Sequence, residues 1–264
     1  YNGTKAGIWV AKFEASRSDA TSSSTGSSNT LKIQPGVRGW STVGVNEIFT
    51  ICQNYNSSLN SHMMKNSEWG AVAYLSRSSY GMNGEIWINN SSRLITGSAG
   101  NSVSAESNVG TTNDYTGTQG VKASTTGTIY GIYDMSGGNW EYVAAYVNNG
   151  HGNLNTYASN LVNAASYMTD VYSSATSSGS DTQSQDYESA KSHYGDAVYE
   201  TSANGEDAGA SWYSDYSYFP STSGPIFLRG GSYRHGANAG IFHFTGEDGT
   251  SIGETSFRPV LIAP

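Results

Sequence analysis

The sequence predicts a mixed α+β protein, and three observations support that prediction. Apolar side chains with helical spacing occur early in the chain, between residues 45 and 76. Short apolar segments separated by glycines are concentrated at the end, between residues 226 and 262. Long polar stretches rich in Ser, Thr, Asn and Gly lie between them. Helices early in a chain and strands late in it favour an α+β architecture over an alternating α/β sheet.

The first strand and two helices follow from the spacing of apolar residues. Residues Ile8–Ala15 mix apolar and polar side chains in alternation, which predicts a strand. Residues Val45–Tyr55 carry apolar side chains at positions i, i+3, i+4 and i+7, which predicts an amphipathic helix. A second helix is expected to have Ser67 as its N-cap and to end by Gly81. The side chains expected on one face of that helix are Trp69, Val72, Ala73 and Ser76.

The rest of the chain has weaker patterns. Residues Glu85–Asn89 predict a short strand, and residues Ser91–Thr128 predict long surface loops. Residues Leu161–Val171 are weakly helical, and residues Ser173–Gln185 predict a Ser/Thr loop. Residues Ile226–Ile262 predict short strands joined by glycine turns.

Charge and composition exclude some classes of partner. The chain has 264 residues, with 13 basic and 21 acidic side chains that give a net charge of −8. Without a basic patch, a nucleic-acid partner loses its main electrostatic attraction, so none is expected. No run of apolar residues is long enough to span a bilayer, so no membrane insertion is expected. A surface of hydroxyls and amides with few charges is common on secreted, filamentous or virion-exposed proteins, and predicts an extracellular, cell-surface or virion location.

Catalytic signatures are sparse. The one cysteine, Cys52, cannot form a disulfide within the chain, and its place on an apolar helical stripe indicates a buried structural thiol. The five histidines occur in no HExxH pattern, and no GxSxG or Walker motif is present. We therefore expect a protein that is not an enzyme.

No cofactor is expected, although two metal sites are conceivable. His235 and His243 with Glu247 and Asp248 offer metal ligands, but their spacing matches no known ligand pattern, so scattered surface histidines are the better interpretation. Glu247, Asp248 and Asn238 offer oxygen atoms for calcium, but the sequence does not place these atoms around one ion.

The C-terminal segment alternates a glycine-rich scaffold with large side chains of unrelated chemistry. The scaffold consists of Leu228–Ser232, Gly236–Gly240 and Ser256–Pro259. Glycine allows sharp turns and close approach of the backbone, so the side chains between these segments are expected to form a recognition surface rather than a core. The candidate ligand-binding residues are Tyr233, Arg234, His235, His243, Thr245, Glu247, Asp248, Thr250, Ile252 and Glu254.

Strand alternation predicts which of these side chains face outward. Phe242 and Phe244 are expected to point inward, and His243 and Thr245 outward. Residues 233–235 add amphipathic contact area of the kind found in antibody paratopes. The alternative interpretation is an ordinary polar hairpin surface.

Four segments together resemble one protein family. Residues Gly131–Val143 (GIYDMSGGNWEYV) are similar to the G-L-Y-D-M-x-G-N-V-W-E-W-V signature of the formylglycine-generating-enzyme superfamily. Residues Leu228–Tyr233 resemble its R-G-G-S-W, residues Ser256–Arg258 its G-F-R, and residues Ile8–Glu14 its first strand. The resemblance implies one C-type lectin-like domain over residues 1–264, with a small twisted antiparallel sheet, two helices and long loops.

Two uses of this family differ in their chemistry. The aerobic enzymes convert a cysteine of sulfatases to formylglycine with a pair of copper-binding cysteines near the C-terminal end, whereas no cysteine follows Cys52 here. The variable proteins of diversity-generating retroelements instead display a ligand-binding face, and residues Arg229–Arg258 are more similar to their R-G-G-S-W-x-x-G-A-N-A-G pattern. Residues His62–Leu75 also resemble phage and gut-bacterial members of this display group.

The resemblance therefore implies a non-catalytic receptor-binding or adhesin domain on a phage virion or bacterial surface. Its partner is expected to be a protein or glycan receptor on a cell surface, and its C-terminal face is a candidate for diversification. The alternative is a structural subunit of a phage fibre, a capsid decoration or a pilus-like filament, so self-association stays open. An enzyme of the formylglycine-generating type is the weakest alternative.

Large side chains within the motifs are expected to be structural. Arg229 and Arg258 are predicted to form charge-assisted hydrogen bonds to loop carbonyls or to carboxylates such as Glu14 or Asp134. Aromatic residues beside glycine-rich turns are more often core residues than ligand platforms. The tryptophans assigned to the core on this basis are Trp9, Trp69 and Trp140.

Overall fold

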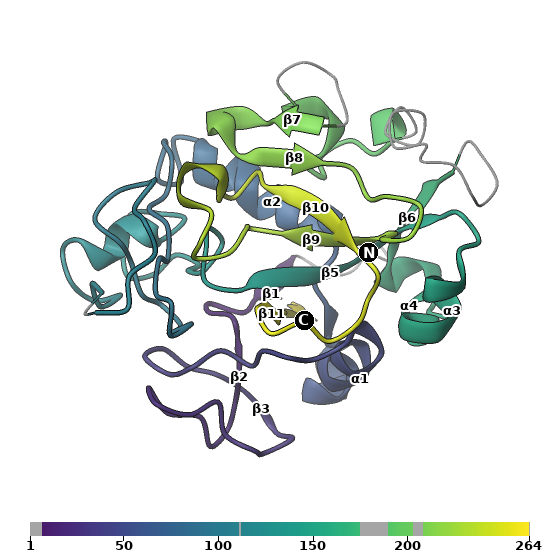
Figure 1. The fold of residues 1–264 in the computed structure, drawn as a ribbon, viewed down its shortest axis with the longest axis horizontal. Helices are drawn as coiled ribbons and strands as arrows, with labels where there is room; N and C mark the ends of the chain where they lie inside the picture. The colour runs from purple at the N-terminus through teal and green to yellow at the C-terminus, as the bar shows by residue number, and fades with distance from the viewer. Residues whose placement is uncertain (1–6, 111, 175–189, 203–207, 264) are drawn as a thin grey trace.

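A computed structural model describes residues 7–110, 112–174, 190–202 and 208–263, and it has a mixed α+β architecture (Figure 1). The large sheet has the strand order β11-β5-β9-β10-β8-β7, with β6 paired to β5. Its strands are β5 (Trp140–Asn148), β6 (Asp170–Ser173), β7 (Ala208–Ala210), β8 (Tyr216–Tyr218), β9 (Ile226–Arg229), β10 (Phe244–Glu247) and β11 (Thr255–Ser256). The α+β prediction is confirmed.

Two smaller sheets are formed by strands from the first part and the end of the described chain. One has the order β1-β12-β4, with β1 (Ile8–Val10), β12 (Pro259–Ile262) and β4 (His62–Met63). The other pairs β2 (Ala15–Arg17) with β3 (Leu31–Ile33). Because β1 and β12 run antiparallel with Ile8 opposite Ile262, the first and last strands lie side by side. The short C-terminal strands joined by turns are as predicted.

Two longer helices and two short ones accompany the sheets. Helix α1 spans Val45–Tyr55, α2 Asn66–Arg77, α3 Gly152–Tyr157 and α4 Ser159–Val162. Short 3-10 turns lie at Ser57–Leu59, Gly120–Ala123, Ser166–Met168, Ala190–Ser192, Tyr199–Thr201, Trp212–Ser214 and Gly236–Asn238. Within the described residues, no helix has the length and apolar character needed to cross a membrane.

Alternate residues of the central strands face two apolar clusters. Val143 and Phe227 pack with α2 in one cluster, whereas Tyr142 and Leu228 pack with α1 in the other. Figure 1 shows α2 behind the large sheet. We call the opposite side of β5, β9, β10 and β8 the front face. Cys52 is buried in the cluster beneath α1, as its helical stripe predicted.

Helix α1 has the predicted bounds, whereas the start of α2 differs. Lys65 occupies the N-cap position, and its backbone N–H donates to Glu68 Oε2 at 3.0 Å. Ser67 lies inside the first turn, where its backbone N–H donates to Asp170 Oδ2 at 2.7 Å, so the predicted Ser67 cap is wrong. The helix ends at Arg77, before Gly81. The predicted apolar face is confirmed, since Trp69, Val72, Ala73 and Ser76 are buried.

Two strand predictions fail because the backbone changes partner. The predicted strand Ile8–Ala15 is divided: β1 pairs with β12, and β2, which begins at Ala15, pairs with β3. Residues Glu85–Asn89 form no strand. The N–H groups of Trp87 and Asn89 donate to Lys122 O and Ser136 O, at 2.8 Å each, so loop backbone replaces a strand ladder.

Two further predictions, one of a loop and one of a helix, need correction, and a third lies mostly outside the described residues. Parts of Ser91–Thr128 lie inside the molecule, where Thr96 and Ala99 are buried, because their backbone bonds to neighbouring loops, whereas the described residues outside these parts are at least partly exposed. In Leu161–Val171, helix α4 ends at Val162 and strand β6 begins at Asp170 beside β5, so tertiary pairing overrides the weak helical pattern. Residues 175–185 of the predicted Ser/Thr loop lie outside the described residues.

Candidate functional site

A buried ion pair fastens the C-terminal segment to the middle of the chain. Arg258 Nε donates to Glu141 Oε2 at 3.1 Å, and its Nη2 forms an ion pair with Oε1 of the same carboxylate. Arg258 also donates to the carbonyls of Ala11 at 2.7 Å and Tyr133 at 2.9 Å. The predicted charge-assisted bonds to loop carbonyls and a carboxylate are confirmed for Arg258, although the carboxylate is Glu141 rather than Glu14 or Asp134.

Two further carboxyl groups lie beside this pair. Asp134 Oδ1 accepts from Asn89 Nδ2 and from the backbone N–H of Gly97, at 2.8 Å each. Glu14 accepts from Asn139, from the backbone N–H at 2.8 Å and from Nδ2 at 2.6 Å. Burial raises the pKa of Glu14 well above its usual value, and the charges of Asp134 and Glu141 raise it further. We call Glu14, Asp134, Glu141 and Arg258 the buried carboxylate cluster.

The cluster positions the first candidate binding residue through a glycine turn. Gly138 has φ +72°, and a Cβ atom there would lie 2.4 Å from Glu14 Oε1, so a larger residue does not fit. The Gly138 carbonyl then accepts the backbone N–H of Tyr233 at 3.0 Å. The glycine of the motif is therefore required both by the backbone conformation and by the carboxyl group packed against it.

Arg229 is also structural, but its environment is different. Its guanidinium is fully buried between the rings of Trp69 and Phe244, 5.6 and 5.7 Å from their centroids. Nη2 donates to the Ala197 carbonyl at 3.1 Å, which confirms the predicted bond to a loop carbonyl. Burial lowers the pKa of Arg229 to about 10. This arginine is enclosed on the α2 side of the large sheet, so its role is structural.

The prediction that His243 points into solvent is wrong. Phe242 and Phe244 are buried in the cluster beside α2, as predicted, but His243 is also buried, with 1% exposure. The turn after Tyr233 folds over it, and the His243 ring nitrogen Nδ1 lies 2.8 Å from the Asn238 carbonyl. Burial lowers the pKa of His243 to about 3, so the ring is neutral at ordinary pH. Alternation along β10 places Thr245, which is partly exposed, on the front face.

Five rings form a row across the front face, which we call the aromatic row. Adjacent ring centroids lie 5.0 Å apart for Trp140 and His235, 5.7 Å for His235 and His243, 5.7 Å for His243 and Tyr216, and 6.2 Å for Tyr216 and Tyr218. Tyr216 is 37% exposed, and Trp140, His235 and Tyr218 are half-buried. The row extends from Trp140 on β5 to Tyr218 on β8, and all of its rings except that of the buried His243 are at least partly exposed.

Sequence reasoning missed three members of this row. Trp140 was assigned to the core, and neither Tyr216 nor Tyr218 was included among the candidate residues. The two tyrosines are separated by one residue, and alternate residues of a strand share a face, so this spacing was an available signal. The core assignment holds for Trp69, which is buried, but not for Trp9, which is 64% exposed on the edge strand β1.

An exposed charged group lies at one end of the aromatic row. Arg234 Nη2 forms an ion pair with Glu254 Oε1, and Arg234 Nε donates to the Tyr233 hydroxyl at 2.6 Å. The Tyr233 ring itself is buried, with 7% exposure, so it is mainly a support for this group. Glu254 is followed directly by β11, which pairs with the start of β5 at Trp140. The structure therefore brings Tyr233, Arg234 and Glu254 together beside the row.

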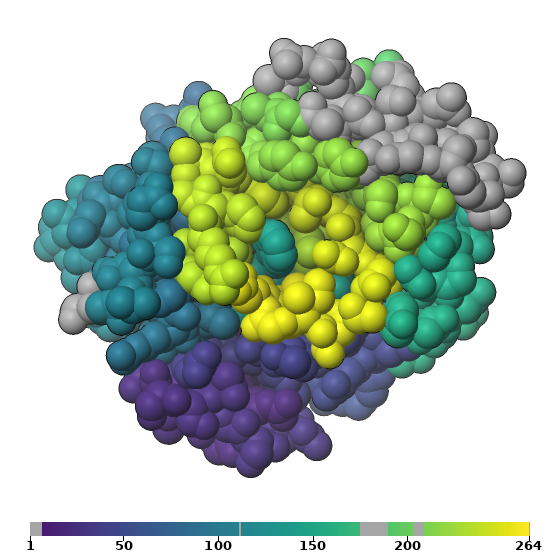
Figure 2. All heavy atoms as spheres, in the orientation of Figure 1, coloured from purple at the N-terminus to yellow at the C-terminus, as the bar shows by residue number. Residues whose placement is uncertain are grey.

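The remaining predicted residues form a loop that borders α1. Asp248 Oδ1 accepts from Thr250, from the backbone N–H at 2.9 Å and from the hydroxyl at 2.7 Å. Thr250 lines a hollow of about 380 Å³ together with the start of α1. Ile252 is half-buried, and burial raises the pKa of Glu247. Figure 2 shows a hollow on the front of the molecule whose border is formed largely by C-terminal residues.

The structure does not assemble the conceivable metal sites. Among the described residues, no group of three or more His, Cys, Asp and Glu side chains is placed to hold a metal ion. His243 is enclosed, and the Asp248 carboxylate is engaged by Thr250. Oxygen or nitrogen ligands from His235, His243, Glu247 and Asp248 therefore do not converge in this conformation.

Comparison with known proteins does not assign a function to this geometry. No protein-family model matches the chain, and its sequence matches none of the curated proteins. The support for a function is therefore the front face itself, together with the resemblance of the sequence motifs that build it.

Proposed function

We propose that this protein is a non-catalytic ligand-binding domain, displayed on a phage virion or bacterial surface, with its binding site on the front face. The observation that carries the proposal is the aromatic row beside the exposed Arg234–Glu254 pair. Half-exposed aromatic rings next to an arginine form the kind of surface that supplies most of the binding energy in protein recognition. A protein or glycan receptor on a cell surface is the partner class that fits.

We call the strands of the large sheet and the buried carboxylate cluster the frame. This frame, which lies beneath the front face, supports a binding role. The sheet carries Trp140, Tyr216 and Tyr218 on three positions of regular strands, and the buried carboxylate cluster fixes the turn that precedes β5. Residues on strands hold a binding geometry more closely than residues on free loops. Arg234, Thr245 and Glu254 can then differ in size or charge without disturbing the buried bonds of the frame.

One apparent catalytic pair on this face has a structural explanation. The Ser232 hydroxyl lies 3.1 Å from His235 Nδ1, a distance compatible with a nucleophile and its base. However, the same Nδ1 accepts the backbone N–H of Ser232 at 2.9 Å, and Ser232 is completely buried. The nitrogen lone pair is therefore used by the turn, and the hydroxyl is closed to a substrate. The better interpretation is that this pair stabilises the turn between Ser232 and His235.

Binding to whole cells tests the proposal. A fluorescently labelled wild-type protein is applied to a panel of bacterial strains, and bound label is measured by flow cytometry. Arg234→Ala combined with Tyr216→Ala is expected to reduce binding about tenfold, because both side chains are exposed parts of the face. Tyr130→Ala is the matched control, since Tyr130 is an exposed tyrosine on another segment. Equal binding by the double variant and the control contradicts the proposed site.

Population sequencing of the 3′ end of the gene tests diversification. The proposal expects substitutions concentrated at the exposed Arg234 and the partly exposed Thr245 and Glu254, with Gly138 and Arg258 unchanged because they belong to the frame. An invariant 3′ end removes diversification and leaves a fixed-ligand adhesin or a structural subunit. Size-exclusion chromatography with light scattering then separates a monomeric binding head from an assembling subunit.

A further inference from the structure

A second candidate site lies on the outer side of α1, apart from the residues of the front face. Two hollows flank this helix, and Thr50 lines both of them. The first has a volume of about 360 Å³ and lies between α1 and the start of β3. The second has a volume of about 550 Å³ and lies between α1 and the segment that begins with α4. The exposed Thr50 is shared by both hollows, and we call the two hollows together the groove across α1.

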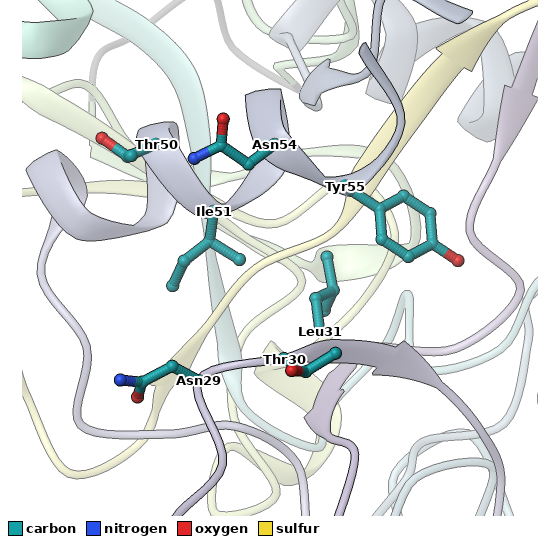
Figure 3. Close-up of a pocket in the computed structure, with 7 residues that line it drawn as sticks. All are labelled: Asn29, Thr30, Leu31, Thr50, Ile51, Asn54 and Tyr55. Atoms are coloured by element: carbon teal, nitrogen blue, oxygen red, sulfur yellow. The ribbon is translucent and has the colours of Figure 1, made fainter. Parts of the chain in front are cut away.

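None of the described residues that line the groove is charged. The residues that line the first hollow are Asn29, Thr30, Leu31, Thr50, Ile51, Asn54 and Tyr55 (Figure 3). The second hollow adds amide side chains from Gln53, Asn160 and Asn163, and the phenol of Tyr167. A neutral lining on a protein with a net charge of −8 favours a neutral ligand, because a charged ligand gains no ion pair there to offset its loss of hydration.

Several polar groups of the first hollow have unused hydrogen-bonding capacity. The side chains of Asn54 and Tyr55 form no hydrogen bond to another residue in the described part of the chain, and both are exposed. Asn29 Oδ1 accepts from Arg17 Nη1 at 3.1 Å, which leaves the Asn29 amide N–H groups for a ligand. An amide offers two donors and an acceptor side by side, so it can bind neighbouring hydroxyl groups of one ligand.

An apolar floor accompanies these polar groups. Figure 3 shows Ile51 on α1 and Leu31 opposite it extending into the space between the helix and the strand. Tyr55, 39% exposed, stands at one side of the hollow, and Tyr167, 57% exposed, lines the second one. A ligand that fits has an apolar C–H face for these surfaces and hydroxyl groups at its edge. A pyranose ring has both.

We propose that the groove across α1 binds a neutral saccharide, with the hollow at Tyr55 as the main subsite and the hollow at Tyr167 as a second subsite for a longer chain. The ring stacks against Tyr55 and the Ile51–Leu31 floor, and its hydroxyl groups bond to Asn54 and Asn29. This site is independent of the front face and of the function proposed above. It gives the protein a second contact with a glycan-coated surface.

A variant at Thr50 tests the proposal. Wild-type protein is applied to an array of neutral, sialylated and sulfated oligosaccharides, and saturation-transfer NMR is recorded with the methyl glycosides of mannose, glucose and galactose. Thr50→Arg is expected to abolish binding, because Thr50 lines both hollows and the longer side chain introduces bulk and a charge where they meet. Thr50→Ser is expected to retain binding, because it keeps the hydroxyl that donates to Asn46 O and accepts from Asn160 Nδ2.

Further variants make the result specific. Tyr55→Ala is expected to weaken saccharide binding about tenfold through loss of the stacking surface. Arg234→Ala with Tyr216→Ala is expected to leave saccharide binding unchanged, so failure of the front face and failure of this groove are distinguishable. Far-UV circular dichroism and the melting temperature show whether each variant is folded. Absence of binding to every neutral saccharide, preference for sialylated or sulfated ones, or normal binding by folded Thr50→Arg overturns the proposal.

Discussion

Two arginine–glutamate pairs in this protein have the same chemistry and different roles. In Arg258–Glu141 both side chains are buried, with 0% and 1% exposure, whereas in Arg234–Glu254 they are 63% and 21% exposed. Removing one member of a buried pair leaves its partner charged, buried and without a hydrogen-bond partner, which strongly lowers stability. An exposed pair contributes little to stability, because water solvates both groups. Burial therefore separates the structural frame of this protein from the surface that we propose as its ligand-binding site.

Replacing the buried arginine is expected to have the largest effect on stability. Arg258→Met removes the cation from among Glu14, Asp134 and Glu141, and leaves those carboxyl groups without a counter-charge. We expect the free energy of unfolding to fall by about 3–5 kcal/mol in urea unfolding. Adding Glu141→Leu is expected to recover part of this loss, because the double variant no longer buries the unpaired carboxylate. A loss below about 1 kcal/mol for Arg258→Met contradicts the structural role.

Arg229 provides a matched control for that experiment. It is as buried as Arg258, but its Nε and Nη1 atoms have no hydrogen-bond partner in the described structure, and its one bond goes to a carbonyl. Arg229→Met places an apolar side chain between Trp69 and Phe244, where it packs well. The loss of stability is therefore expected to be clearly smaller than for Arg258→Met.

Much of the frame could be predicted from the sequence, because its signals are local. The apolar spacing of Val45–Tyr55 predicted α1 to the residue, and the glycine motifs placed the turns before β5 and after β9. The partner of Arg258 could not be predicted, since Glu141 is 117 positions away and three buried carboxyl groups compete for one cation. Division of the first strand likewise depends on pairing with β12, near the other end of the described chain.

The candidate site was predicted in part. Alternation correctly assigned Phe242 and Phe244 to the core, but it carries no information about a turn that folds back over His243. Trp140 was missed because it joins the site through β5, which lies far from the C-terminal motif in sequence, and Tyr216 because it joins the site through the pairing of β8 with β10. Local patterns indicate which face a residue occupies, and tertiary contacts decide whether that face is open.

Glu14 is expected to give the frame a pH dependence. Its raised folded pKa means that the folded protein keeps a proton that the unfolded chain releases above about pH 4.3. The unfolding free energy therefore falls as the pH rises from that value toward the folded pKa, by up to about 1.4 kcal/mol per pH unit. Glu14→Gln is expected to reduce this slope in urea unfolding between about pH 5 and 8.

The amide introduced by Glu14→Gln retains the geometry of the cluster. Its carbonyl can accept the Asn139 backbone N–H, and its N–H₂ group faces Asn139, whose Oδ1 has no partner in the described structure and can accept after the Asn139 amide turns. Asp134 and Glu141 also have raised pKa values because of burial, so part of the slope remains. Identical slopes for the wild type and Glu14→Gln mean that Glu14 is ionised in the folded protein at these pH values.

His243 is expected to act in the opposite direction. Its folded pKa is about 3, whereas the unfolded side chain takes up a proton near pH 6.5, so stability is lost as the pH falls from about 6.5 toward 3. His243→Asn keeps a donor for the Asn238 carbonyl but does not titrate, and it is expected to remove this loss. Comparing urea unfolding of the variant and the wild type at about pH 6.5 and 4.5 isolates this proton from that of Glu14. An unchanged acid slope indicates that the turn opens to admit the proton.

Replacing the exposed arginine is expected to have the smallest effect on stability and a large effect on binding. Arg234→Ala breaks the ion pair with Glu254 and the hydrogen bond to Tyr233, but water solvates the groups left behind, so the free energy of unfolding is expected to change little. Binding to a responsive bacterial strain is expected to fall, and the loss to be greater at low salt than at high salt. A large drop in stability would mean that this pair has a structural role like that of Arg258–Glu141. Unchanged stability and unchanged binding would mean that the ligand contacts the aromatic row nearer Tyr216 and Tyr218. Binding by the Tyr216→Ala and Tyr218→Ala variants would test that location.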